Sequence, residues 1–577
     1  MKNKTKTFIA GILVAIMAVP LLFSALGTTV VNADETNGAF PGSFLGVGPG
    51  LYGPVLVQVT MPDPTTISSV TVLSHDETHN IGNVPMELFS DLIVRYQTLQ
   101  MPIVTGATIS SMAMLTAVHD AINRSGASPA SFTGAVTLDV PATDTSADIV
   151  VIGGGGAGLT AASFAAREGN NVILVEKTGL LGGTTSYVIE QIGSVGTITH
   201  QVLGTDVTPA MWAETIIANN PNGIPEHLEY FAHAKGPALD WLRNIGAPFT
   251  VAAAQTGVQP NWQIGEPGVA IVSALRLEAE RAGVDVRTWS QATEILMTGD
   301  AVSGVRVSTP NGEYTISTSA VILATGGFTS NSEMVAEHRP DLAHLSSAAS
   351  TSNQGQGHVM AQNVGAAVSN MDHIRMGATY ATASSGYWYW VNHALNWGAI
   401  LVNADGERFM NDTAGWPGGP TALAQGNPLY YIFDNTPVEV AREVRRFQDL
   451  GLLITADTLE ELFTMVEADT DGLRATIERY VGFVENGVDE DFGRPLLNNR
   501  FNSPPFHAIR AEVRIQGTMG GVTTDLEARV LTPAGEPIPG LFAAGEVADD
   551  GLWGQNPAAI NLVFGRVAGL SASEFVR

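Results

Sequence analysis

The sequence predicts an α/β fold in which a Rossmann-like nucleotide-binding domain follows a small α+β domain. Residues 148–152 form a continuous apolar strand that runs directly into a glycine-rich turn and a helix. Before this strand, short β-type segments alternate with turns over residues 39–134. The chain has 577 residues, of which 45% are hydrophobic and 15% charged, so it can bury the cores of two or more domains.

The composition excludes several classes of function. The chain has 28 Lys and Arg against 56 Asp and Glu, a formal net charge of -28. Such a charge repels phosphate backbones, so neither nucleic acid nor an anionic membrane is expected as a primary partner. The chain contains no cysteine, which excludes disulfides, thiolate metal sites, cysteine-ligated clusters and a cysteine nucleophile. Any redox chemistry therefore needs an organic cofactor.

Residues 1–33 have the pattern of an export signal. Three lysines within the first six residues precede an apolar run from Phe8 to Leu26, and small residues lead to Ala33. We expect cleavage after Ala33 and an extracytoplasmic protein. The apolar run is also long enough to cross a bilayer of about 30 Å, so an uncleaved anchor is the alternative.

The first domain is predicted over residues 34–138. Apolar strands run through Leu56–Val57 and Val70–Val72, and apolar residues at helical spacing predict a helix from Ser110 to Ile122. Residues 139–147 are polar and contain a proline, which is typical of a linker.

The glycine-rich turn after the linker fits the dinucleotide-binding pattern G-x-G-x-x-G. A helix is expected over residues 159–168 and a second strand over residues 172–175, which ends at Glu176. Glycines let the backbone approach a pyrophosphate, the helix N-terminus offers N–H donors, and the acid accepts ribose hydroxyls. The motif alone leaves FAD and NAD open. Its residues are Gly153, Gly155, Ala157 and Gly158.

Three later segments narrow the choice of cofactor: Gly-Gly-Thr-Thr at 182–185, Ala-Thr-Gly-Gly at 324–327 after the strand 320–323, and Ala-Gly-Glu at 544–546. Together with the motif they resemble the flavoprotein subunit family of fumarate reductases and succinate dehydrogenases, and more closely its exported, FMN-carrying branch that includes urocanate reductase. The resemblance covers nearly the whole chain from Ala39 and implies non-covalent FAD. Besides the motif, it assigns to FAD the residues Glu176, Lys177, Gly183, Thr184, Thr185, Ala324, Thr325, Gly326, Gly327, Gly545, Glu546 and Asn561.

The resemblance also implies the domain order. Residues 148–372 and 517–577 form one Rossmann-like FAD-binding domain, with an α+β capping domain of residues 373–516 inserted between them. The small α+β domain before them, residues 34–138, is similar to the FMN-binding domains of that branch.

Residues 75–82 and 105–111 carry the likeness to FMN-binding domains, which implies FMN joined covalently to Thr108 by a separate flavin transferase. From the residues themselves, Thr108 opens a helix whose free N–H groups can meet a phosphate, and a helix cap without cofactor is the alternative. One departure is Pro102, where the family often carries Asp. Asp76, Glu77 and His79 have metal-binding side chains, but the resemblance places them in the FMN domain and no metal is predicted.

The capping domain departs from the family pattern. Trp416 lies where the family places its proton-donating Arg, Gly517 replaces a substrate-binding His, and residues 553–561 contain no basic side chain. A bound dianion needs fixed cationic partners, so fumarate is not expected. Aromatic residues are concentrated instead, which predicts a flat, conjugated, weakly charged substrate unless the rings simply pack in the core. They are Tyr380, Tyr387, Trp388, Tyr389, Trp390, Trp397 and Trp416.

We therefore predict an FAD-dependent reductase of an activated C=C bond, supplied with electrons through FMN from a membrane or surface donor. The candidates for catalysis are Arg375, Tyr380, Tyr387, His393, Trp416 and Arg514, whereas Arg408 is interpreted as structural. Urocanate reductase proper, a dehydrogenase running the reaction in reverse, and a flavin-bearing electron shuttle without an organic substrate remain alternatives.

Overall fold

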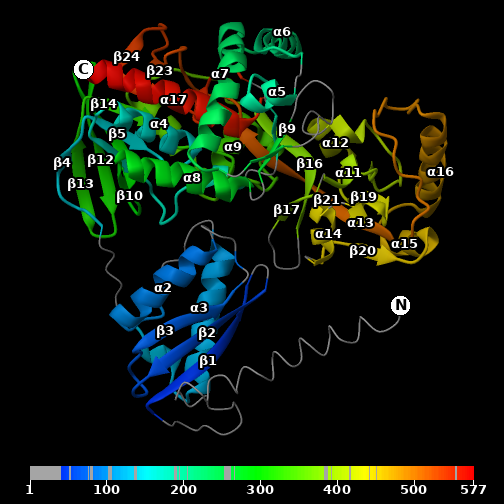
Figure 1. The fold of residues 1–577 in the computed structure, drawn as a ribbon, viewed down its shortest axis with the longest axis horizontal. Coiled ribbons are helices and arrows are strands. Elements are labelled where there is room, and N and C mark those ends of the chain that lie inside the picture. Colours follow the sequence, from blue (N-terminus) through cyan, green and yellow to red (C-terminus); the bar gives the residue numbers. More distant parts are fainter. Residues whose placement is uncertain are drawn as a thin grey trace.

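The computed structural model describes most of the chain. The described residues are 40–50, 53–75, 77, 82–101, 107–134, 140–187, 191–193, 195–203, 206–247, 249–251, 261–264, 267–382, 388–391, 393–414, 418–440, 442–449, 451–552 and 555–577. The predicted export signal lies outside them, as do Asp76, His79, Pro102, Tyr387 and Trp416. Figure 1 shows an N-terminal domain in blue, a central domain in cyan, green and red, and a capping domain in yellow and orange.

The N-terminal domain is a three-stranded antiparallel sheet covered by two helices. The strands are β1 (Gly42–Pro49), β2 (Pro54–Met61) and β3 (Ser69–Ser74), and the helices are α2 (Asn83–Tyr96) and α3 (Thr108–Arg124). Alternate residues of β2 point into the core, where Val55, Val57 and Val59 are fully buried. The predicted strands and the predicted helix are confirmed, and α3 begins two residues before the expected Ser110.

Helix α3 lies directly on the backbone of β1. A Cβ atom on Gly46 would lie 1.9 Å from the carbonyl oxygen of Ala117, and one on Gly48 would lie 1.9 Å from that of Ala113. Only glycine allows this approach, so these two glycines fix the distance between sheet and helix.

The predicted linker leads into the central domain. Its last part forms the short strand β4 (Thr145–Ser146), which pairs in parallel with β13 (Gly312–Ser317). Asp144 accepts a hydrogen bond from the backbone N–H of Thr315 at 2.7 Å. The linker is thus anchored to an edge of the central domain.

The central domain is built on a six-stranded sheet in the order β10-β6-β5-β14-β24-β23. All pairs are parallel except the last. Every residue of β5 is buried, since Ile149 and Val151 face a helical layer and Val150 and Ile152 face a second sheet. The strands are β5 (Ile149–Ile152), β6 (Val172–Val175), β10 (Asp285–Arg287), β14 (Ala320–Leu323), β23 (Arg529–Leu531) and β24 (Pro537–Ala543).

One face of this sheet carries helices and the other an antiparallel sheet. The helical layer contains α4 (Gly156–Arg167), α7 (Pro225–Asn244), α8 (Pro267–Ala282) and α17 (Pro557–Val576), and the facing sheet contains β11 (Gln291–Thr298), β12 (Ala301–Thr309), β13 and β4. Among the described helices, α17 is long and apolar enough to cross a membrane, yet 56% of its apolar window is buried. A Cβ on Gly569 of α17 would lie 2.4 Å from the carbonyl oxygen of Ala161, so α17 packs tightly on α4 as a core helix.

Smaller elements complete the central domain. They are β7 (Gln191–Gly193), α5 (Ile198–Leu203), α6 (Pro209–Asn219), β8 (Phe249–Val251), β9 (Asn261–Ile264), α9 (Ser332–His338), α10 (Gln356–Asn363), β15 (Val368–Ser369), β22 (Gly521–Thr523) and β25 (Ala548–Asp549).

The capping domain is an insertion whose first and last strands pair with each other. In this pairing of β16 with β21, Ile374 lies opposite Thr518, so the chain leaves and re-enters the central domain at one place, as the resemblance implied. The sheet order is β17-β16-β21-β19-β18, and β20 also pairs with β21. The strands are β16 (Ile374–Thr382), β17 (Trp388–Trp390), β18 (Ile400–Val402), β19 (Leu429–Asp434), β20 (Ile454–Ala456) and β21 (Phe506–Thr518). The helices are α11 (His393–Asn396), α12 (Gly419–Gln425), α13 (Thr436–Val440), α14 (Arg442–Asp449), α15 (Leu459–Met465) and α16 (Thr470–Asn486).

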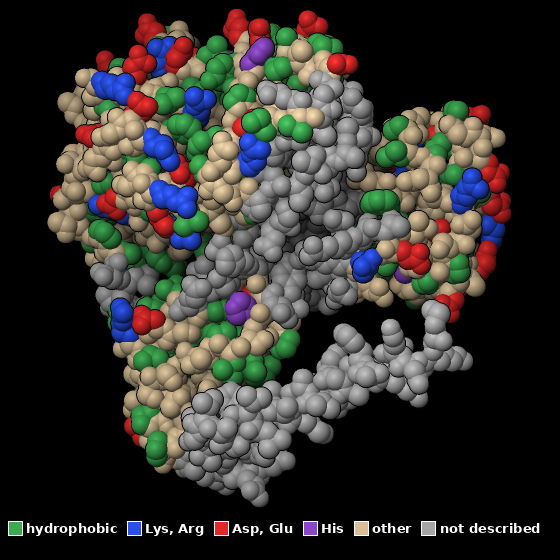
Figure 2. Space-filling view, in the orientation of Figure 1, with side chains coloured by type: hydrophobic (Ala, Val, Ile, Leu, Met, Phe, Trp, Pro, Cys, Tyr) green, Lys and Arg blue, Asp and Glu red, His purple; other side chains and the backbone are tan. Residues whose placement is uncertain are grey.

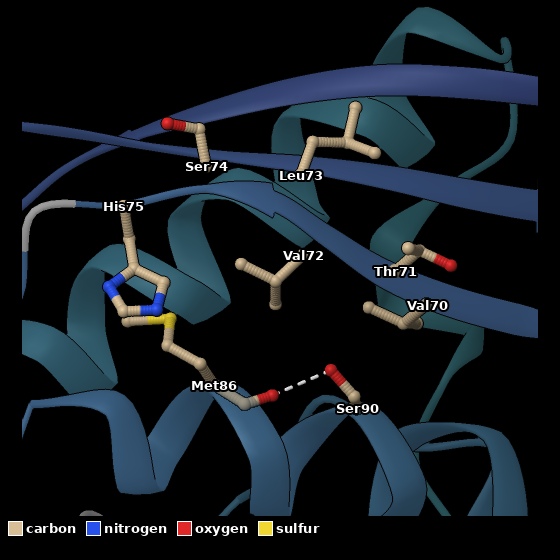
Figure 3. A pocket seen from close by; sticks show the side chains of 8 residues that line it. All are labelled: Val70, Thr71, Val72, Leu73, Ser74, His75, Met86 and Ser90. Carbon is tan, nitrogen blue, oxygen red and sulfur yellow. Dashed lines mark hydrogen bonds between the residues drawn. The ribbon is translucent and has the colours of Figure 1, made fainter. Parts of the chain in front are cut away.

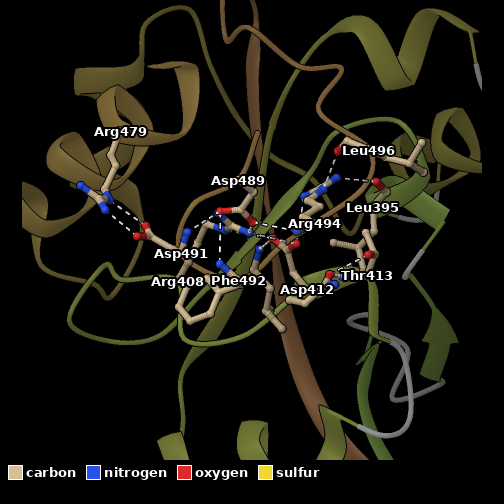
Figure 4. Close-up of polar contacts among 12 residues, drawn as sticks. Leu395, Arg408, Asp412, Thr413, Arg479, Asp489, Asp491, Phe492, Arg494 and Leu496 are labelled. Carbon is tan, nitrogen blue, oxygen red and sulfur yellow. Dashed lines mark hydrogen bonds and ion pairs between the residues drawn. The ribbon is translucent and has the colours of Figure 1, made fainter. Parts of the chain in front are cut away.

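A buried group of charges holds the capping domain together (Figure 4). Arg408 donates to Asp489 at 2.8 Å and to Asp412 at 3.3 Å, and its side chain is 4% exposed. Arg494 lies on the other side of Asp412 and also donates to the carbonyl oxygens of Leu395, Ala399 and Leu496. The structural interpretation of Arg408 is therefore confirmed.

Acidic side chains are prominent at the edges of the molecule. In Figure 2 they outline the upper edge of the central domain and the outer edge of the capping domain, while Lys and Arg are interspersed on the central domain. This distribution agrees with the formal net charge of -28.

Candidate active site

The glycine-rich turn between β5 and α4 leaves space for a phosphate. A Cβ on Gly158 would lie 1.9 Å from the carbonyl oxygen of Gly153, so Gly158 is needed for the helix to pack on the strand. Gly155 is different, because the nearest described atom to a Cβ there is the carbonyl oxygen of Gly182 at 3.8 Å. Helix α4 begins within the motif at Gly156, earlier than predicted, and its cap residue, Gly155, makes no side-chain hydrogen bond to the first turn. Open space beside the first turn of a helix fits the pyrophosphate of a dinucleotide.

Glu176 lies at the end of β6, beside this turn. Its carboxylate accepts hydrogen bonds from the backbone N–H of Gly154 at 2.8 Å and from Thr178 at 2.9 Å. Lys177 points away from it and donates to the carbonyl oxygen of Ser352 at 2.6 Å and to Gln356. Burial lowers the pKa of Lys177, while the charge of Glu176 opposes that shift. Glu176 thus lies where it was predicted, and Lys177 ties β6 to the loop before α10.

Thr184, Thr185 and Asn561 join three distant segments around the turn. Thr185 Oγ1 accepts from the backbone N–H of Gly156 at 3.0 Å and from Asn561 at 3.3 Å. Thr184 Oγ1 accepts from the backbone N–H of Ser350 at 3.3 Å. The structure therefore brings these predicted cofactor residues together at the N-terminus of α4.

Gly545 closes the turn from the C-terminal segment. Its φ is +79°, and a Cβ there would lie 2.7 Å from Asn561 Oδ1 and 2.8 Å from the Cβ of Ala157. Gly545 is therefore required both by its backbone conformation and by its neighbours.

The segment after β14 lies against Glu546. Gly326 has a φ of +73°, and a Cβ on Gly327 would lie 2.6 Å from Glu546 Oε1. Thr325, next to Ala324, has a buried hydroxyl that packs against Gly357 of α10. These residues shape the backbone so that the Glu546 carboxylate fits beside it.

Glu546 connects the central domain to the base of the capping domain. Its Oε1 accepts from the backbone N–H of Thr518 at 2.9 Å, and its Oε2 accepts from Asn353 at 3.0 Å. Burial raises the pKa of Glu546, and the hydrogen bonds from Thr518, Asn353 and Gly327 oppose the shift. These bonds hold the carboxylate between Gly327, Asn353 and the end of β21.

Arg375 and Gly517 lie opposite each other where the two domains meet. They are register partners in the pairing of β16 with β21. Burial lowers the pKa of Arg375 to about 10, and the charges of Tyr380 and Glu546 oppose the shift. Tyr380 is 2% exposed and lies opposite Glu512 in the same strand pair. Two predicted catalytic residues, Arg375 and Tyr380, therefore lie on β16, whose first residue is opposite Thr518, a partner of Glu546.

Arg514 is held in a different set of contacts. It donates to Glu512 at 3.1 Å, to Thr382 Oγ1 at 2.8 Å and to the carbonyl oxygen of Ser347 at 3.4 Å. These hydrogen bonds join β21, β16 and the loop before Ala348. The contacts of Arg514 therefore hold these strands together.

The other predicted catalytic residues are not placed. Tyr387 and Trp416 lie outside the described residues, and His393 opens α11 with a side chain that is not described. Residues Trp388–Trp390 form β17 and pair with Tyr380–Thr382, which puts the aromatic segment on the same sheet edge as Tyr380. Trp397 is 39% exposed and lies at the surface of the capping domain.

The N-terminal domain offers a second helix N-terminus. Thr108 is the first residue of α3, its side chain is not described, and Ala107 occupies the cap position without a side-chain hydrogen bond. The cap alternative thus receives no support. Ser110, in the first turn, donates to the buried carboxylate of Glu77. An uncapped helix start fits a phosphate group.

A groove of about 570 Å³ opens between β3 and α2 in the same domain (Figure 3). β3 is an edge strand, and Ser90 donates to the carbonyl oxygen of Met86 at 2.6 Å on the floor formed by α2. None of the predicted site residues lines the groove. Its lining residues are Val70, Thr71, Val72, Leu73, Ser74, His75, Met86 and Ser90.

The sequence reasoning missed Asn353 and Thr518 as partners of Glu546. Thr518 directly follows Gly517, which the resemblance had marked, so a signal for it existed. Asn353 lies in a polar loop without a recognisable pattern, and only the fold brings it to Glu546.

Comparisons with known proteins support this arrangement. The FAD binding domain family matches residues 148–563, and the FMN-binding domain family matches residues 50–123. Urocanate reductase of Eggerthella lenta is 30% identical over 92% of this chain and 92% of its own. The open conformation of a flavocytochrome c3 fumarate reductase superposes with a TM-score of 0.65 at 28% identity, over 75% of this chain and 79% of that one. The 3-ketosteroid-Δ4-(5α)-dehydrogenase of Rhodococcus jostii, in complex with 4-androstene-3,17-dione, has a TM-score of 0.62 at 25% identity, over 75% of this chain and 98% of that one.

Proposed function

The chain belongs to the FAD-binding oxidoreductase family that includes urocanate and fumarate reductases, and we propose that it is an exported reductase of a conjugated C=C bond. Its relatives are FAD-dependent enzymes acting on C=C bonds, and the chain carries an FMN-binding domain as well. The observation that carries the proposal is the position of Arg375 opposite Gly517, next to Thr518, whose N–H donates to Glu546 at the junction of the two domains.

The charge of this group favours a weakly charged substrate. Among the described residues at the junction, Arg375 lies opposite Gly517, and Arg514 is already bound by Glu512 and Thr382. A buried dianion needs a surplus of fixed positive charge. An aryl-acrylate or an enone has a single carbonyl or carboxylate end and fits better. Relatives of this chain include one enzyme named for urocanate and one named for a 3-ketosteroid. The fold therefore accommodates both an aryl-acrylate and an enone as substrate.

The chain itself must supply a proton. Bound FAD supplies two electrons as a hydride to one carbon of the double bond, and the neighbouring carbon then takes a proton from a side chain. We assign this donation to Arg375, because it lies opposite Gly517 where the two domains meet, and burial lowers its pKa to about 10. Tyr380, on the same strand, is a second candidate donor, and the deprotonated guanidinium then regains its proton from solvent.

The N-terminal domain is proposed to bring in the electrons. FMN joined through its phosphate to Thr108 by a flavin transferase would lie at the uncapped start of α3. Electrons then come from a membrane or surface donor outside the cytoplasm, in keeping with the predicted export signal over residues 1–33. The intact mass of the exported protein tests this point. One FMN bound covalently to Thr108 increases the mass by one FMN group, and this increase should be absent in Thr108→Ala. Cleavage after Ala33 predicts a mature N-terminus at Asp34.

An anaerobic assay with reduced methyl viologen tests the activity. Purified protein carrying both flavins is given cinnamate, urocanate and fumarate in separate reactions. In a further reaction the photoreduced protein is mixed with ferricyanide without viologen, because reduced viologen reduces ferricyanide directly. Turnover of cinnamate, with or without urocanate, supports the proposal. Turnover of urocanate alone supports the alternative, urocanate reductase proper. Reaction with ferricyanide but with no enoate contradicts the proposal and supports the electron shuttle.

A further inference from the structure

We propose that Leu180 and Trp289 couple the dinucleotide site of the central domain to the docking of the N-terminal domain, so that filling the site holds the two domains together. The inference goes beyond the proposed function, because it needs neither a substrate nor turnover. It starts from one loop, residues 176–182, which is called the ribose loop here because it begins with Glu176.

Leu180 and Trp289 are central-domain residues that pack against the hydrophobic core of the N-terminal domain. That core is built from residues between Phe44 and Phe132. Leu180 lies in the ribose loop after β6, and Trp289 follows β10, so the two come from neighbouring strands of the central sheet. Both side chains are half-buried. They therefore form part of the contact between the two domains.

Trp289 is held in a conformation that residues with a side chain rarely adopt. Its φ is +54°, in the left-handed region. Its backbone N–H donates to the carbonyl oxygen of Thr178 at 3.0 Å, and a Cβ on Gly179 would lie 2.4 Å from its indole ring. Because such a backbone persists only where its surroundings fix it, the ribose loop sets the position of the indole.

The ribose loop also borders the dinucleotide site. Glu176, the predicted partner of the ribose, accepts from the backbone N–H of Gly154 in the phosphate turn at 2.8 Å and from that of Thr178 at 2.9 Å. The hydroxyl of Thr178 donates to the carbonyl oxygen of Leu180 at 2.8 Å. Contacts therefore run from the phosphate turn through Glu176 and Thr178 to both Leu180 and Trp289.

Two consecutive leucines of the ribose loop pack against different cores. Leu180 packs against the core of the N-terminal domain, whereas Leu181 packs against the helical layer of the central domain. Leu181 also lies over the phosphate turn, since a Cβ on Gly154 would lie 2.5 Å from its Cδ2. A shift of the loop at the dinucleotide site therefore also moves the surface that the N-terminal domain covers.

This arrangement links cofactor binding to domain docking. A bound dinucleotide would fix the ribose loop through its ribose hydroxyls. The loop in turn fixes the apolar surface formed by Leu180 and Trp289. By thermodynamic linkage, docking of the N-terminal domain must raise the affinity for the cofactor by the same factor by which the cofactor favours docking.

Hydrogen–deuterium exchange of the full chain, measured by mass spectrometry with and without added FAD, tests this coupling. In the wild type, saturating FAD should slow exchange in peptides of the N-terminal domain as well as around the phosphate turn. In Trp289→Gly, where glycine adopts a positive φ without strain, and in Leu180→Ala, FAD should protect only the phosphate turn. Trp397→Ala, at the surface of the capping domain, is the control and should behave as the wild type.

The affinity for FAD gives the reciprocal measurement. Trp289→Gly and Leu180→Ala should each raise the dissociation constant of FAD about tenfold, measured by calorimetric titration of the FAD-free protein, and Trp397→Ala should leave it unchanged. A role of Trp289 confined to the ribose loop would weaken FAD binding too, but the N-terminal domain would still respond to FAD.

Three results overturn the proposal. They are an N-terminal domain whose exchange is insensitive to FAD in the wild type, a response to FAD that persists in both variants, and a dissociation constant that is unchanged in both. None of these measurements uses a substrate. Failure to reduce any enoate therefore rejects the proposed function and leaves this inference in place.

Discussion

Arg494 and Asp412 form a buried ion pair in the capping domain, with Nη1 of the arginine 3.1 Å from Oδ1 of the aspartate and side chains 0% and 1% exposed. Asp412 also accepts from Arg408 and from the backbone N–H of Leu401. One buried carboxylate therefore joins two arginines, as Figure 4 shows, and it also binds the strand β18 through Leu401.

Removal of this carboxylate should destabilise the capping domain. Asp412→Ala leaves two buried guanidinium groups without their shared partner, which costs roughly 3–5 kcal/mol. The melting temperature measured by differential scanning calorimetry should fall, with the central domain unfolding separately at its original temperature. Asp471→Ala, which breaks an exposed pair with Arg474, is the control and should leave both transitions in place. An unchanged capping transition in Asp412→Ala would contradict this prediction.

FAD binding should be lost when the phosphate turn is crowded. In Gly158→Val the new side chain meets the carbonyl oxygen of Gly153, which a Cβ would already approach to 1.9 Å. The ratio of flavin to protein absorbance should fall at least about tenfold. Gly482→Val should retain full flavin content, and retention of FAD in Gly158→Val would show that α4 can shift away from β5.

The stability of the protein should depend on pH through Asp550. Burial raises the pKa of Asp550 from 3.8 to about 7, with the nearby Asp549 adding to the shift and a hydrogen bond from Leu552 opposing it. The folded state therefore holds this proton more tightly than the unfolded state does, so stability falls as pH rises from about 4 to about 7. Asp550→Asn should remove that part of the pH dependence and raise the melting temperature at pH 8 relative to the wild type.

The control for this prediction is Asp549→Asn. Asp549 accepts from Ser369 and Asn370 at 2.6 Å each, so its substitution should lower the melting temperature. Because it also removes a charge that raises the pKa of Asp550, the dependence of the melting temperature on pH should become smaller but remain, unlike in Asp550→Asn. A slope that is the same in Asp550→Asn and in the wild type would show that another group titrates.

Turnover should depend on Arg375 and much less on Arg514. Arg375→Gln removes the proposed acid and should lower kcat about 10²–10⁴-fold while FAD stays bound. Arg514→Lys should retain most of the activity, since its contacts are with Glu512, Thr382 and Ser347. The dependence of kcat on pH distinguishes the two roles. Loss of the proton donor in Arg375→Gln should abolish the decrease of kcat at alkaline pH, whereas loss of a strand contact in Arg514→Lys should leave that decrease in place. An unchanged kcat in Arg375→Gln would move the assignment to Tyr380.

Most of the fold could be predicted from local patterns. The strands at 149–152, 172–175 and 320–323 lie where apolar runs predicted them, because buried parallel strands are continuous in hydrophobicity. The start of α4 was predicted three residues too late, since glycine at 156 gives no helical signal although the backbone there is already helical. The linker was predicted without structure, yet β4 forms there because β13 offers a free edge.

The candidate site divides in the same way. The glycines at 153 and 158, and the acid at the end of β6, follow from the chemistry of phosphate and ribose binding, which demands those residue types at that spacing. The contacts of Glu546 with Asn353 and Thr518 could not be predicted in this way. Nearly 200 residues separate Asn353 from Glu546, and no spacing rule connects them.

The sequence by itself determined that this chain holds a dinucleotide against a glycine-rich turn, that it lacks thiol chemistry, and that a flavin family describes it. These properties depend on residue types and short spacings, which are visible in the amino-acid sequence. Only the tertiary structure decided that Arg375 lies opposite Gly517 and that Glu546 binds the neighbouring Thr518. That arrangement depends on the antiparallel pairing of β16 with β21 across the inserted domain, and such long-range pairing is set by the packing of the whole capping domain.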